Sequence, residues 1–112
     1  MADCLFCRVC RGEARADRVH EDALAVVIRD INPAAPTHLL VLPRKHIASL
    51  ADLTPEDDAL LGHLHRVGRD VARAAGPTDY RLVVNCGPDA GQSVFHLHLH
   101  VLAGRAFSWP PG

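Results

Sequence analysis

Apolar residues recur along this chain at helical spacing over one stretch, between residues 53 and 75, which predicts a single long amphipathic helix. Thr54 is placed to cap its first turn, Pro55 suits the first helical position, and Gly76 with Pro77 stops the pattern. The apolar face consists of Leu60, Leu64, Val67 and Val71.

Short runs rich in β-branched and aliphatic residues predict five strands around this helix. They cover residues 18–20, 23–28, 37–42, 80–85 and 93–102. Only two residues separate the first two runs, which favours a hairpin. Because most strands are neighbours in sequence and one long helix crosses between the third and the fourth, we expect an α+β fold. Its sheet is mainly antiparallel, with the helix on one face.

Composition narrows the function classes. The 112 residues suit one domain over 1–112, with an extended tail at 103–112 that ends in Trp109, two prolines and Gly112. A net charge of −1 gives no electrostatic reason to expect nucleic acid or a membrane surface as a partner. Because the chain has neither an apolar run of about 20 residues nor a secretory signal pattern, we expect a cytoplasmic protein.

The run 93–102 carries the most distinctive pattern. In a strand, alternate side chains point to opposite faces, so Phe95, Leu97, Leu99 and Val101 form a predicted core row. His96, His98 and His100 then share the other face.

Three interpretations of this histidine face remain open from the residues alone. It can be a solvated polar face, a three-histidine zinc site of a metal hydrolase, or a nucleophilic centre whose closely spaced imidazoles keep one another neutral. Gly91, Gln92 and Ser93 directly upstream offer a flexible backbone, an amide and a hydroxyl for phosphate oxygens. Their position favours the nucleophilic interpretation, with phosphorus as the electrophile.

The segment 96–102 matches the alternating pattern of the histidine triad (HIT) family, in which three histidines alternate with hydrophobic residues and two more hydrophobic residues follow. The segments 29–33, 36–47, 83–85 and 91–95 match as well, and the tail 109–112 resembles that of the histidine triad nucleotide-binding (Hint) branch. The resemblance implies a HIT-like fold with a short N-terminal helix besides the long one, and a homodimer across which the sheet extends.

The resemblance also implies an activity, hydrolysis of the P–N bond of adenosine or guanosine 5'-phosphoramidates to AMP or GMP. His98 would be the nucleophile, with His96 and His100 as the other catalytic histidines. A nucleotide-binding or scaffolding dimer with incidental hydrolysis is the alternative. The implied substrate-binding residues are Phe6, Asp30, Ile31, Asn85, Gly91, Gln92, Ser93, His98, His100 and Trp109.

Several of these residues also have structural interpretations. Asp30 suits the turn before Asn32 and Pro33, and Asn85 can cap a loop. Phe6 and Ile31 can be ordinary core residues. Trp109 can anchor an interface, whereas the resemblance places it near the active site of a second subunit.

Three of the four cysteines lie close together, at Cys4, Cys7 and Cys10, which does not suit a disulfide framework. Prokaryotic members of the family often pair such a Cys-x-x-Cys with two histidines. The resemblance therefore implies a structural zinc ion on Cys4, Cys7, His46 and His96, and no organic cofactor. If His96 binds zinc, His98 and His100 alone remain for direct chemistry.

Overall fold

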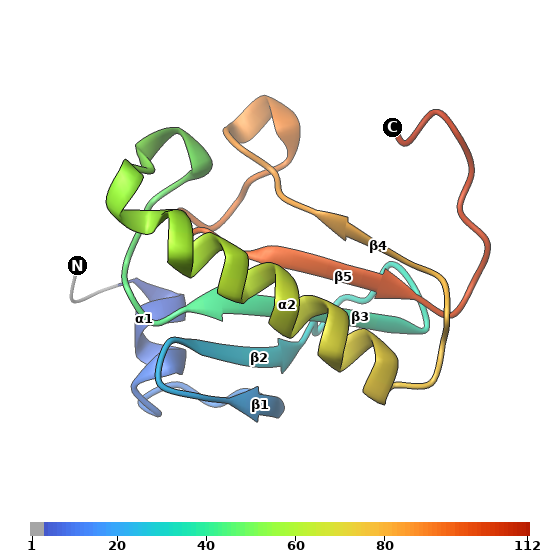
Figure 1. Ribbon diagram of the computed structural model, residues 1–112, viewed down its shortest axis with the longest axis horizontal. Helices are drawn as coiled ribbons and strands as arrows, with labels where there is room; N and C mark the ends of the chain where they lie inside the picture. Colours follow the sequence, from blue (N-terminus) through green and yellow to red (C-terminus); the bar gives the residue numbers. More distant parts are fainter. Residues whose placement is uncertain (1–3) are drawn as a thin grey trace.

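The computed structural model describes residues 4–112. The expectation that the chain has no secretory signal pattern rests in part on residues 1–3, which lie outside the described residues. The helices and strands are α1 (Leu5–Cys10), β1 (Arg18–Glu21), β2 (Ala25–Arg29), β3 (Thr37–Pro43), α2 (Asp58–Ala74), β4 (Tyr80–Val83) and β5 (Leu99–Ala103). All strand pairs are antiparallel, in the order β1-β2-β3-β5-β4. The α+β prediction with one long and one short helix is confirmed (Figure 1).

The long helix begins where the sequence predicts. Thr54 and Asp57 form a capping box, and Pro55–Asp57 makes a 3₁₀ turn that leads into α2. Asp57 also accepts a hydrogen bond from Lys45 Nζ at 2.6 Å, which ties the start of the helix to the segment after β3.

No helix within residues 4–112 is long and apolar enough to cross a membrane.

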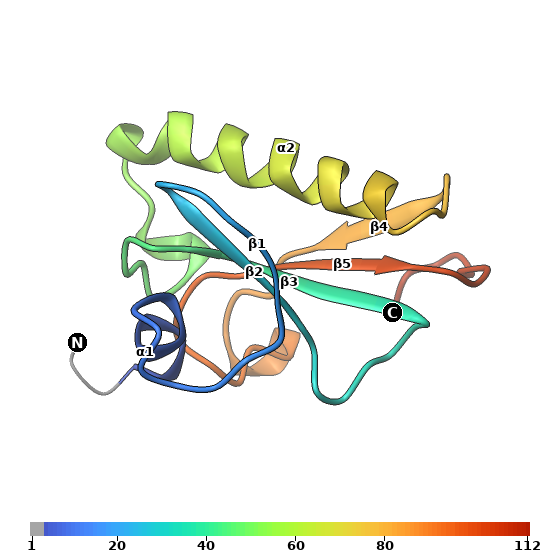
Figure 2. The same cartoon turned by 90° about the horizontal axis from the view of Figure 1, so that it is seen from below.

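Both faces of the sheet are covered, α2 lying on one and α1 on the other (Figure 2). Odd-numbered residues of β2, β3 and β5 pack with α2, among them Val27, Val41 and Val101. Even-numbered residues of β2 and β3 pack with α1, among them Val26 and Leu42. Strands β2 and β3 therefore have near-continuous apolar runs, and the even-numbered face of β3 and β5 is the one that carries His38 and His100.

The last strand is shorter than predicted, because β5 begins at Leu99 and residues 93–98 lie outside the sheet. In the register that pairs Val41 with Leu99, Pro43 falls opposite Leu97 and has no N–H to donate. The N–H of Leu97 bonds to the carbonyl of Ile47 instead. The predicted core row is correspondingly wrong at Phe95, which is 48% exposed.

Two helical glycines of α2 give a matched test of how closely the helix packs on the sheet. A Cβ at Gly62 would contact nothing within 4 Å, whereas a Cβ at Gly68 would lie 3.2 Å from Leu99 Cδ2. We expect Gly62→Ala to raise the free energy of unfolding by about 0.5–1 kcal/mol through helix propensity. Gly68→Ala should give no gain, because Leu99 is buried and cannot move aside. Urea denaturation measures both, and equal stabilisation would contradict this packing.

Candidate functional site

A pocket of about 390 Å³ lies on the α1 face of the sheet, beside the histidines. Six of the sequence-predicted site residues line it together, namely Phe6, Asp30, Ile31, Ser93, His98 and His100. Further residues that the sequence analysis did not select complete the wall, namely Leu5, Val9, Arg15, Ala16, Asp17, Ile28, Arg29, Leu40 and Val94. The pocket thus combines an apolar wall from α1 with polar groups from three other segments.

The tautomer of His98 is fixed by the chain itself. Its Nδ1 lies 2.7 Å from the backbone carbonyl oxygen of His96. A carbonyl can only accept, so Nδ1 carries the proton and donates it. In the neutral ring the other nitrogen, Nε2, therefore has a free lone pair in a residue that lines the pocket.

His100 is oriented by His38, a residue that the sequence analysis did not select. The amide N–H of Ala34 donates to His38 Nδ1 at 2.9 Å, so His38 Nε2 carries the proton. This proton is donated to His100 Nδ1, 2.9 Å away, with a carboxylate oxygen of Asp30 at 3.4 Å. His100 therefore holds its own proton on Nε2 and is a hydrogen-bond donor from that atom.

Burial, with His98 and His38 nearby, lowers the pKa of His100 from 6.5 to about 4. His100 is therefore neutral near pH 7. The signal for His38 was present in the sequence as the one imidazole in strand β3, whose residues after it are all apolar. Its partner could not be known without the pairing of β3 with β5.

The predicted site residues Asn85, Gly91 and Gln92 do not line the pocket and lie on the loop that leads to Ser93. The Gln92 amide accepts from Gly87 N–H and donates to the carbonyls of Ala48 and Val94. Gly91 has φ +99°, and a Cβ there would approach the Asn85 side chain at 3.5 Å. These three residues shape the loop.

Two further predictions concern exposed or turn residues. Trp109 is 81% exposed, lies 5.9 Å from the guanidinium of Arg81, and does not line the pocket of its own chain. Asp30 accepts from Asn32 N–H at 2.8 Å, so the turn interpretation of Asp30 holds for one of its carboxylate oxygens. The other oxygen lies near His38.

The four predicted metal ligands converge. Cys4 Sγ lies 3.3 Å from His96 Nδ1, Cys7 Sγ lies 3.3 Å from His46 Nδ1, and the two Nδ1 atoms are 3.2 Å apart. Bond lengths of about 2.3 Å for Zn–S and 2.0–2.1 Å for Zn–N give tetrahedral edges of about 3.3–3.8 Å. The observed separations are close to the edges of such a tetrahedron.

Proton positions at His96 support the same conclusion. Its Nε2 donates to the carbonyl of Pro43 at 2.8 Å, which leaves Nδ1 as a lone pair aimed at the cluster. Burial lowers the pKa of His96 and raises the pKa of the Cys7 thiol. A buried thiolate needs a cation nearby, and the four residues fit a structural zinc ion.

A second cluster, formed by Asp30, His38 and His100, also brings three ligand-type atoms close together. Here the hydrogen bonds do not suit a metal, because His38 Nδ1 already accepts from an amide and Nε2 must carry the proton.

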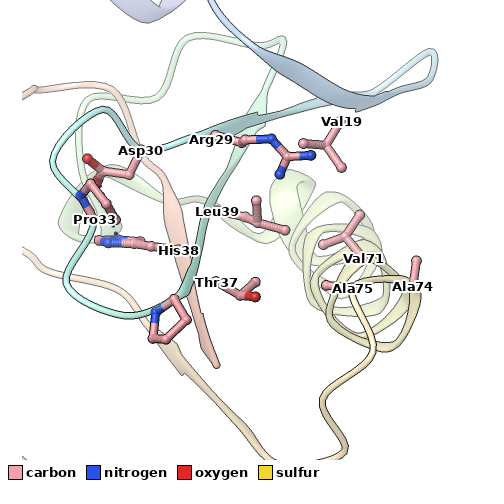
Figure 3. A pocket seen from close by; sticks show the side chains of 11 residues that line it. Val19, Arg29, Asp30, Pro33, Thr37, His38, Leu39, Val71, Ala74 and Ala75 are labelled. Atoms are coloured by element: carbon pink, nitrogen blue, oxygen red, sulfur yellow. Dashed lines mark ion pairs between the residues drawn. The ribbon is translucent and has the colours of Figure 1, made fainter. Parts of the chain in front are cut away.

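Asp30 and His38 also line a second pocket of about 380 Å³ that extends to the C-terminal end of α2 (Figure 3). The contact between the Asp30 carboxylate and His38 Nε2–H thus lies between two pockets.

Comparisons with known proteins agree with this geometry. A family model described as "Scavenger mRNA decapping enzyme C-term binding" matches residues 3–108. An uncharacterised HIT-like protein of Synechocystis sp. is 50% identical over 111 residues, 98% of this chain and 97% of the relative. The crystal structure of a HIT family hydrolase from Legionella pneumophila Philadelphia 1 is 46% identical, with a TM-score of 0.95 and coverage of 98% of this chain and 100% of that chain.

The crystal structure of a zinc-bound histidine triad family protein from Mycobacterium smegmatis is 37% identical to this chain. Its TM-score is 0.83, and the match covers 93% of this chain and 76% of that chain. A zinc-bound relative and the converging Cys4, Cys7, His46 and His96 together support the predicted structural zinc site.

Removal of the metal should destabilise the fold. We expect one Zn²⁺ per chain, and chelation or Cys7→Ser should lower the melting temperature by at least about 10 °C, because binding energy at a structural site is folding energy. Metal analysis and thermal denaturation measure this. Cys10→Ser is the matched control, since Cys10 lies on the same helix but outside the cluster, near the carbonyl of Pro43, and should keep its zinc. A Cys7→Ser protein with full zinc content would contradict the assignment.

The lowered pKa of His100 predicts a pH dependence of stability. As pH falls from about 6.5 to about 4, the unfolded chain binds a proton at His100 that the folded chain excludes, so the free energy of unfolding declines. His100→Asn should flatten this decline, measured by urea denaturation between pH 7 and pH 4 at matched zinc content. Parallel curves for the two proteins would show that His100 titrates normally in the folded state.

Proposed function

This chain belongs to the histidine triad (HIT) family, and we propose that it is a nucleotide-binding hydrolase. Its substrates in this proposal are purine nucleoside 5'-phosphoramidates, whose P–N bond it cleaves through a covalent nucleotidyl-histidine. The similar Legionella pneumophila protein is named a hydrolase, which supports this reaction class.

The observation that carries the proposal is the hydrogen bond from His98 Nδ1 to the carbonyl oxygen of His96. In the neutral ring it leaves the lone pair on Nε2, the nitrogen that would attack phosphorus. The same bond stabilises the positive charge that the ring acquires when Nε2 bonds to phosphorus. His100, the other histidine among the residues that line this pocket, instead accepts a hydrogen bond at Nδ1 from His38.

Phosphate oxygens would be held by the groups around His98. His100 offers its Nε2–H, and the Ser93 hydroxyl lines the same pocket. Asp30 and His38 act as positioning residues, since they keep the proton of His100 on the nitrogen that can donate to phosphate. Gln92, Gly91 and Asn85 would contribute through the loop that carries Ser93.

The nucleoside would occupy the rest of the pocket, whose volume and mixed lining suit a small ligand. Phe6 and Ile31 offer an apolar surface to a purine ring, and the Ile31 side chain is 92% exposed. The Asp30 carboxylate oxygen that does not serve the turn can accept from ribose hydroxyls. AMP and GMP both fit these requirements.

The reaction then has two displacements at one phosphorus. His98 Nε2 bonds to the α-phosphorus as the P–N bond breaks, and the amine leaves with a proton from water. Water next attacks the same phosphorus, the bond to His98 breaks, and the nucleoside monophosphate is released with a proton. The homodimer, and a role for Trp109 of the second subunit in selecting the amine, stay predictions from the family resemblance.

Replacement of the nucleophile tests the proposal. We expect His98→Ala to lower kcat for an adenosine 5'-phosphoramidate by at least about 10³-fold, because both displacements need Nε2. Rapid quenching followed by mass spectrometry should find an adenylyl group on His98 of the wild-type protein.

The matched control is His65→Ala, which removes an exposed imidazole from α2 that bonds to the carbonyl of Leu61. This variant should keep wild-type turnover. Unchanged turnover in His98→Ala would exclude His98 as the nucleophile. Binding of AMP by the wild-type protein without any turnover would favour the scaffolding alternative.

A further inference from the structure

Helix α1 and its N-cap residue Cys4 bring two metal ligands and three pocket residues together. Cys4 caps the helix and Cys7 lies in its first turn, with Phe6 between them. A helix this short is not stable by itself, so its position depends on packing and on what its cysteines bind. Leu5, Phe6 and Val9 of the same helix line the nucleotide pocket.

Phe6 connects the two sites directly. Its ring meets the His98 ring edge-on, with centroids 5.1 Å apart and planes at 85°. It also meets the ring of His96, a zinc ligand, at 6.0 Å and 80°. Phe6 is buried, so a shift of the Cys4–Cys7 turn must move its ring against one imidazole or the other.

His96 makes a second connection. Its Nδ1 faces the metal cluster, and its carbonyl oxygen is the acceptor that fixes the tautomer of His98. The ring is fully buried and held at its other end by the Pro43 carbonyl. The orientation of this one residue therefore sets both the ligand atom of one site and the nucleophile of the other.

We propose that zinc binding and nucleotide binding are thermodynamically coupled, with Phe6 as the positioning residue that carries the coupling. Zinc on Cys4 and Cys7 fixes the position of α1. The α1 side of the pocket, which includes Phe6, is then ordered before a nucleoside binds. Without the metal, part of the free energy of nucleotide binding is used to order α1 and Phe6. This inference rests on the proposed function for the identity of the ligand.

Linkage makes the proposal testable in both directions, since each ligand must change the affinity of the other by the same factor. The probes are Zn²⁺ and AMP. A chromogenic chelator competes for Zn²⁺ with and without saturating AMP, and calorimetry gives the AMP affinity of zinc-loaded and metal-free protein. We expect AMP to tighten zinc binding at least about fivefold, and zinc to tighten AMP binding by an equal factor.

Two failures are distinguishable. If AMP binds but the zinc affinity is the same with and without it, this inference is overturned and the proposed function stands. If the zinc-loaded protein does not bind AMP at all, the proposed function fails and this inference fails with it.

Phe6→Leu separates local coupling from a general effect of folding. This variant keeps all four zinc ligands, so its zinc affinity without AMP should stay within about twofold of wild type. The coupling factor, which is the ratio of zinc affinities with and without saturating AMP, should fall toward one. Coupling that persists in Phe6→Leu would show that AMP protects zinc only by favouring the folded chain, and would overturn the role of Phe6. Cys86→Ser, which removes an exposed thiol outside the cluster, is the matched control and should keep the full coupling factor.

Discussion

The arrangement of the site depends on the point at which β5 leaves the sheet. Arg44 donates its N–H to Leu24 beside β2, so the adjacent position, Pro43, faces β5 and has no N–H to offer. The ladder ends there, and backbone groups of residues 93–98 bond to partners outside the sheet ladder, among them the Ile47 carbonyl and the His98 ring. Pro43 contributes its carbonyl to His96, and the His96 carbonyl is taken by His98. Without this interruption the three histidines would lie on one strand face with equivalent surroundings.

Each histidine then acquires its role from one backbone partner that cannot change its hydrogen-bonding character. A carbonyl can only accept, so His96 and His98 must donate to their partners, from Nε2 and Nδ1 respectively. An amide N–H can only donate, so His38 must accept at Nδ1, and the proton position of His100 follows. The proton positions of these imidazoles are therefore set by backbone groups, whose own positions the sheet and its loops fix.

The same reasoning separates the two clusters of ligand-type atoms. At His96 the second nitrogen donates to a carbonyl, the arrangement usual for a metal-binding imidazole, and two thiols complete a tetrahedron. At His38 the second nitrogen accepts, so metal binding through Nε2 would require a fully deprotonated ring. Proximity of ligand-type atoms does not distinguish the two clusters. The direction of one hydrogen bond in each cluster does distinguish them.

The sequence by itself determined the elements with strong local signals, and it selected residues that meet in the pocket and in the Cys4, Cys7, His46 and His96 cluster. Thr54, Pro55 and the apolar period placed α2 correctly, because capping and helical spacing are local properties. Alternation at His96, His98 and His100 selected the site. Tertiary structure alone decided the rest: where β5 ends, that Phe95 is exposed, and that His38 orients His100. These depend on which strand lies opposite and on which backbone group faces each ring, and such long-range pairings leave no periodic trace in the chain.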